Sequence, residues 1–166
     1  YGPSRQLVGQ SKEVFSIIGY AANRKGQPVL MADLGTVVHE FNHSFIKIEG
    51  DTKNALAKSG KTIKSYSAFC MKQQAYDSWQ TILEESLVRA AEKCYFIEHW
   101  DGKVDKGIRN EMNHGFFWMP ELVQTLRYYE SHRKKYPTFT SFYPEIIRFF
   151  DRYVADVEKE IQKALK

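Results

Sequence analysis

Two histidines stand four residues apart in the pentapeptide His39-Glu40-Phe41-Asn42-His43, and this spacing requires a helix if both side chains are to bind one ion. On an α-helix, residues four apart lie on the same face, about one turn from each other. The H-E-x-x-H pattern on a helix is typical of zinc hydrolases, in which both histidines bind the metal and the glutamate acts as a general base. The pentapeptide therefore predicts a helix and, on that helix, a metal site.

The residues around the pentapeptide have the period of an amphipathic helix. At about 100° per residue, the apolar residues of this stretch fall on one stripe: Leu34, Val37, Val38, Phe41, Phe45 and Ile48. His39 and His43 fall on the opposite side, with Glu40 at its edge. Asp33 can cap the first turn, and the pair Gly50-Asp51 is typical of a helix end. A solvated polar face without a metal is the competing interpretation, which the complete motif disfavours.

A catalytic zinc ion takes three protein ligands and leaves one position for water, so the two histidines need a third partner. A metzincin would place a histidine six residues after His43, where this chain has Glu49. The other common solution is a glutamate on a second helix. The periodic segment Tyr76–His99 predicts such a helix, apolar almost all round. It carries four glutamates: Glu84, Glu85, Glu92 and Glu98.

A carboxylate in so enclosed a helix needs a partner, because an unpaired buried charge is costly, and a zinc ion would be one such partner. Helical phase does not choose between Glu84 and Glu85, which flank the apolar stripe on opposite sides. Arg89 stands four residues after Glu85, the spacing at which opposite charges meet on a helix. It could orient the Glu85 carboxylate from behind, or it could form an ordinary helix ion pair.

The pentapeptide and the later segment Glu84-Glu85-Ser86-Leu87-Val88-Arg89-Ala90 together resemble the gluzincin arrangement, in which H-E-x-x-H is followed by a helix that bears a glutamate ligand. Set on that pattern, Glu85 is the ligand, and Glu84 replaces the usual asparagine. The interval from His43 to Glu85 is longer than in the well-studied gluzincins.

A closer resemblance is to an uncharacterised bacterial domain family of unknown function with metallopeptidase-like motifs. Its members have similar H-E-F-x-H-S-F and E-S-L-V-R-A blocks and a stretch like Tyr136-Pro137-Thr138-Phe139, and the likeness extends from about Val14 onward. This resemblance implies a zincin-like peptidase and favours a secreted or periplasmic location.

Zinc on His39, His43 and Glu85 would lower the pKa of a water molecule at the fourth position, and Glu40 would take the proton of that water as it attacks a peptide carbonyl. The sequence therefore predicts a zinc-dependent peptidase acting on a peptide or protein substrate. The alternative is a catalytically inactive zincin-fold binding module.

Gluzincins often supply a tyrosine or histidine to stabilise the oxyanion of the transition state. The candidates here are Tyr136, His114 and His132. We favour Tyr136 because it lies in a block that carries the family resemblance. A packed tyrosine at the turn before Pro137 is the competing interpretation.

Composition bounds the remaining possibilities. The chain has 166 residues, 43% of them hydrophobic, which suffices for a single domain over residues 1–166. It starts at Tyr1 without a methionine, so we expect a fragment of a longer protein. No apolar run is long enough to span a membrane.

Cys70 and Cys94 are expected to be free thiols, although one bridge is conceivable. Oligomeric state stays open.

The net charge of +4 and the cluster His132-Arg133-Lys134-Lys135 suggest nucleic-acid binding. Elsewhere, however, basic residues alternate with acidic ones, as at Glu158-Lys159-Glu160, which favours a solvated mixed surface. We expect no nucleic-acid partner.

Periodicity and turn residues predict a mostly helical α+β domain, in which a small sheet packs on the H-E-x-x-H helix. We expect strands over Glu13–Tyr20 and Pro28–Met31, the second as a short extended run. A turn is expected over Asp101–Lys103. Further helices are expected over Thr52–Lys58, broken at Ser59-Gly60, and over Ile63–Met71, Pro120–Lys134 and Pro144–Leu165.

Overall fold

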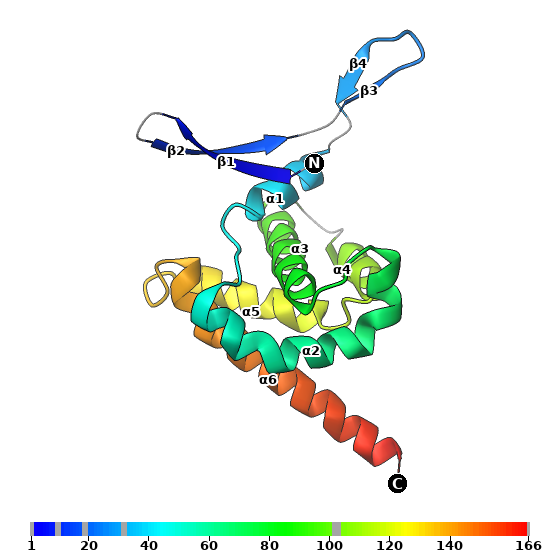
Figure 1. Ribbon diagram of the computed structural model, residues 1–166, viewed down its shortest axis with the longest axis vertical. Helices are drawn as coiled ribbons and strands as arrows, with labels where there is room; N and C mark the ends of the chain where they lie inside the picture. Colours follow the sequence, from blue (N-terminus) through cyan, green and yellow to red (C-terminus); the bar gives the residue numbers. More distant parts are fainter. Residues whose placement is uncertain (1, 9–10, 18–19, 31–32, 101–103, 166) are drawn as a thin grey trace. The chain divides into compact units, whose positions relative to one another are not determined.

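The computed structural model describes residues 2–8, 11–17, 20–30, 33–100 and 104–165 (Figure 1). The chain divides into two compact units, Tyr1–Lys47 and Ile48–Lys166. Within the described residues, the first unit contains four strands and the motif helix, and the second contains five helices. The structure is therefore mostly helical, as predicted.

The strands of the first unit form two separate antiparallel hairpins (Figure 1). In the first hairpin, β1 (Gly2–Val8) pairs with β2 (Ser11–Ile17). In the second, β3 (Tyr20–Ala22) pairs with β4 (Pro28–Leu30). The prediction of a small sheet packed on the motif helix is not confirmed, because the described strands form only these two separate two-stranded hairpins. Residues 18, 19 and 31, at the ends of the two predicted strands, lie outside the described residues.

The motif helix is α1 (Leu34–Asn42). It begins where predicted, because the Asp33 carboxylate accepts a hydrogen bond from the Thr36 backbone N–H at 2.9 Å. It ends before Ile48: the backbone N–H of Ser44 donates to Phe41 and that of Phe45 donates to Asn42, which are tight-turn bonds. The predicted stop at Gly50-Asp51 is wrong, because the next helix starts there.

The second unit is a bundle in which α3 packs against α2, α4 and α5, and α6 packs against α2 and α5 (Figure 1). Its helices are α2 (Gly50–Gln73), α3 (Trp79–His99), α4 (Val104–Asn113), α5 (Met119–Ser131) and α6 (Phe139–Ala164). The largest fully buried side chains include Trp118, Phe116, Phe142, Phe150, Ile63 and Leu83. Among the described residues, no helix is long and apolar enough to cross a membrane.

The helix α2 is continuous, so the predicted break at Ser59-Gly60 is wrong. Both residues are buried, and the Gly60 backbone lies directly against the indole of Trp79. A glycine here permits close helix packing and does not end the helix. The predicted helix Ile63–Met71 is the second half of α2.

Two other boundaries also differ from expectation. Sequence periodicity did not predict α4, whose residues are mostly polar. The helix α6 starts before Pro144, because Thr138 and Ser141 form a reciprocal capping box. The predicted turn Asp101–Lys103 lies outside the described residues.

Candidate metal centre

The two motif histidines lie one turn apart at the end of α1, with Nε2 of His39 3.3 Å from Nε2 of His43. Their rings are 5.0 Å apart and inclined by 77°. Two nitrogen ligands about 2.05 Å from one tetrahedral zinc ion lie about 3.3 Å from each other. The α1 backbone therefore holds the imidazoles at the separation that a shared ion requires.

Glu85 lies in the middle of α3 and is only 9% exposed. The helix is fixed at its start by Ser78, whose side chain accepts from the Thr81 backbone N–H at 2.9 Å. The Glu85 carboxylate accepts a hydrogen bond from the Tyr76 hydroxyl at 3.1 Å. A buried carboxylate of this kind is a suitable oxygen ligand for a metal ion.

Together His39, His43 and Glu85 form a group that could hold a metal ion, since one ligand atom from each lies within 4.8 Å of the others. It is the only such group of three or more histidine, cysteine, aspartate or glutamate side chains found over the described ranges. These are the three residues that the sequence indicated as ligands.

Glu84, the alternative that helical phase left open, has a different environment. Its Oε1 accepts from the Ile48 backbone N–H at 2.8 Å and from Gln80 Nε2 at 3.4 Å. Gln80 also donates to the Ile48 carbonyl oxygen at 3.0 Å. Glu84 therefore holds the chain that leads into α2, and it is not part of the metal-ligand group.

Arg89 meets Glu85 as the spacing predicted, but its closest partner is Glu111 on α4. Its Nη1 donates to Glu111 Oε2 at 2.8 Å, whereas its Nε lies 3.6 Å from Glu85 Oε2. Arg89 Nη2 donates to the Tyr76 hydroxyl at 3.1 Å, and the guanidinium lies 4.9 Å from the centre of the Phe116 ring. Burial by itself would lower the pKa of Arg89, but Glu111, Tyr76 and Glu85 outweigh it and raise that pKa.

Tyr76 precedes α3, and its hydroxyl lies between Arg89 and Glu85. Burial raises the pKa of the Tyr76 phenol, and the negative charge of Glu85 raises it further. The phenol therefore stays protonated at neutral pH and can donate a hydrogen bond. This role was not predicted: the expected helix included Tyr76, but periodicity does not show that its hydroxyl meets Arg89 and Glu85.

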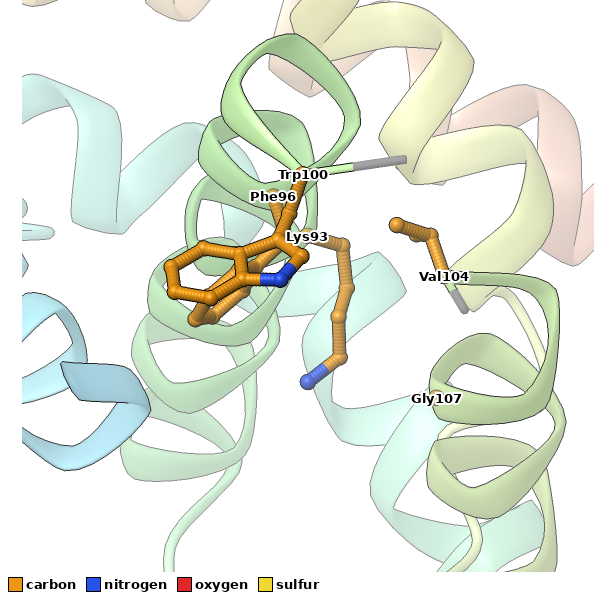
Figure 2. Close-up of a pocket in the computed structure, with 5 residues that line it drawn as sticks. All are labelled: Lys93, Phe96, Trp100, Val104 and Gly107. Carbon is orange, nitrogen blue, oxygen red and sulfur yellow. The ribbon is translucent and has the colours of Figure 1, made fainter. Parts of the chain in front are cut away.

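Glu111 continues the charged network to Lys93, whose Nζ lies 3.1 Å from Glu111 and 3.0 Å from Glu92. The Lys93 side chain extends between α3 and α4, where it lines a cavity of about 260 Å³ (Figure 2). The other described residues that line it are Phe96, Trp100, Val104 and Gly107. Glu111 and Lys93 were not predicted, since their meeting depends on α4.

The remaining predicted residues lie as follows. Glu40 follows His39 on α1 and is partly exposed. Tyr136 is buried, packs on Phe142 and donates its hydroxyl proton to Glu145. That hydrogen bond raises the pKa of Tyr136. The role of Tyr136 in stabilising an oxyanion stays a prediction.

The two histidines that competed with Tyr136 have structural contacts in the described part of the chain. His132 stacks on Tyr128, and its Nδ1 lies 2.9 Å from the Tyr128 carbonyl oxygen. The backbone carbonyl of His114 accepts from Gln74 Nε2 at 2.6 Å.

Comparison with known proteins yields a family but no activity. No curated protein matches the chain, and no solved structure matches it. One family model does, over residues 11–149, and that match includes His39, His43 and Glu85. The chain therefore belongs to the family described as "Domain of unknown function (DUF4932)".

Proposed function

We propose that this chain is a zinc-dependent peptidase of the gluzincin type, with His39, His43 and Glu85 as metal ligands and Glu40 as general base. The observation that carries the proposal is the 3.3 Å separation of the His39 and His43 Nε2 atoms on α1. Because Glu40 directly follows His39, the helix that orients the ligands also carries a base beside them. The proposal includes one catalytic domain and zinc as the physiological ion.

The ligand set suits zinc chemically. Imidazole nitrogen and carboxylate oxygen are both common zinc ligands, and two histidines with one glutamate leave a position open for water. A bound zinc ion would lower the pKa of a water molecule and polarise the carbonyl group under attack. Glu40 would accept the proton of that water and then deliver it to the leaving amine.

A non-catalytic zincin-fold binding module is the second candidate, and one observation favours it. The hydroxyl of Tyr136, our predicted oxyanion donor, is engaged by Glu145. A site without such a donor would bind a metal but lose much of the stabilisation that the transition state needs.

Glu40→Gln separates the two candidates, because it removes the base but keeps the size of the side chain. We expect the variant to bind as much zinc as the wild type and to cleave a peptide library at least ~100-fold more slowly. Glu49→Gln, at an exposed glutamate outside the motif, is the matched control and should leave cleavage unchanged. Cleavage readings come from mass spectrometry of the library.

Undiminished cleavage by the Glu40→Gln variant would overturn the catalytic role of Glu40. A wild-type protein that binds zinc yet cleaves no peptide would favour the non-catalytic binding module over the peptidase.

A further inference from the structure

The carboxylate of Glu85 is approached from one side by two groups of the second unit. Tyr76 donates to Oε2 at 3.1 Å, and Arg89 Nε lies 3.6 Å from the same oxygen. One hydrogen bond and one ion pair to the same oxygen restrict rotation of the carboxylate, and metal-ligating carboxylates are commonly oriented by such neighbours.

The direction of the Tyr76 hydrogen bond follows from its other partner. A guanidinium can only donate, so the Tyr76 oxygen accepts from Arg89 Nη2. The single hydroxyl proton is then available for Glu85, which as a carboxylate can only accept. Tyr76 therefore links Arg89 to Glu85 through two hydrogen bonds, so the position of Arg89 influences the orientation of the Glu85 carboxylate.

Arg89 is in turn held from a second helix. Glu111 on α4 accepts from its Nη1 at 2.8 Å, and Glu111 also binds Lys93 at 3.1 Å. The guanidinium Nε is buried and has no hydrogen-bond acceptor within the described part of the chain. A small rotation of the Glu85 carboxylate toward Nε would satisfy this donor, which is costly to leave unpaired.

We infer that Tyr76 is a positioning residue for the metal ligand Glu85. Glu111 supports Tyr76 indirectly, because it fixes Arg89, which donates a hydrogen bond to the Tyr76 hydroxyl. This inference rests on the proposed metal site. The ligand concerned is a divalent cation, and the network fixes the direction in which Glu85 presents its carboxylate to that cation. Tyr76 need not touch the ion or the substrate.

The test compares Tyr76→Phe with Tyr153→Phe in the full chain. Both changes remove one hydroxyl from a partly buried tyrosine, but Tyr153 packs on Trp118 and Phe149, away from the network. We expect Tyr76→Phe to weaken zinc binding by about 10- to 100-fold, measured by competition with a chromogenic chelator. Tyr153→Phe should bind zinc as the wild type does.

Cobalt(II) gives a second readout that a merely structural role would not change. Its visible absorption reports ligand geometry, so the Tyr76→Phe spectrum should differ from that of the wild type while Tyr153→Phe matches it. Wild-type zinc affinity and an unchanged cobalt spectrum in folded Tyr76→Phe would overturn the inference and leave the metal site standing. No metal binding by the wild type would overturn both.

If Tyr76→Phe does not fold, Glu111→Gln provides a second test. This change keeps the shape of the side chain but removes its charge, so Arg89 loses its strongest partner. We expect weaker zinc binding in the same direction, and wild-type affinity would contradict the inference.

Discussion

Burial of the Glu85 side chain is favourable only because charged and polar groups surround it. An uncompensated buried carboxylate costs several kcal/mol, and here Tyr76 and Arg89 offset part of that cost. Glu84, one residue earlier, instead accepts from a backbone N–H. The two adjacent glutamates thus have different partners. Helical phase could not separate them, because the difference comes from segments distant in sequence.

The two cysteines should differ sharply in reactivity. Burial raises the pKa of Cys94 to about 12, and Glu130 adds to this effect, whereas Cys70 is only partly buried. Because the thiolate is the reactive form, we expect iodoacetamide at pH 8 to modify Cys70 in the folded protein and spare Cys94. Peptide mapping after alkylation measures both sites.

Unfolding in urea is the control for this labelling, since it should make Cys94 as reactive as Cys70. Equal modification of both thiols in the folded chain would contradict the burial of Cys94. Both residues are free thiols in the structure, which confirms the expectation from their number and spacing.

At the scale of helices and strands, periodicity identified the segments that bury a regular apolar stripe. The positions of α3 and α5 agree with expectation to within a few residues, whereas α1 begins where expected but ends at Asn42, well before the expected stop at Gly50-Asp51. Periodicity does not predict helix boundaries that depend on tertiary contacts. Glycine typically ends a helix, and the contact of Gly60 with Trp79, which keeps it inside α2, is not evident from the sequence. The helix α4 has mostly polar residues and therefore no clear apolar stripe.

Gly60→Ala should destabilise the packing of α2 on α3. A methyl group at this position would collide with the Trp79 indole and crowd Leu83. Overpacking of this kind costs about 1–3 kcal/mol, which outweighs the gain of up to ~1 kcal/mol in helix propensity. Urea denaturation followed by circular dichroism gives the free energy of unfolding.

Gly107→Ala is the matched helical control. A methyl group there would meet only the aliphatic stem of Lys93, at 3.6 Å, so the free energy of unfolding should stay equal or rise. Equal stability of the wild type and Gly60→Ala would show that α2 and α3 do not pack as described.

At the scale of the whole molecule, the candidate site became less predictable as the distance along the chain between its parts increased. His39 and His43 follow from a four-residue spacing on one helix. Glu85 required the resemblance to gluzincins, because no local rule links it to α1. The supporting contact between Arg89 and Glu111 depends on α4, and so it could not be predicted.

The zinc content of the purified protein tests the proposed metal site most directly. After zinc is added and free metal removed, elemental mass spectrometry should find about one zinc per chain in the wild type. His39→Ala should lose this zinc, while His132→Ala, at an exposed histidine that stacks on Tyr128, should retain it. Equal zinc in wild type and His39→Ala, or none in either, would contradict a metal centre at His39, His43 and Glu85.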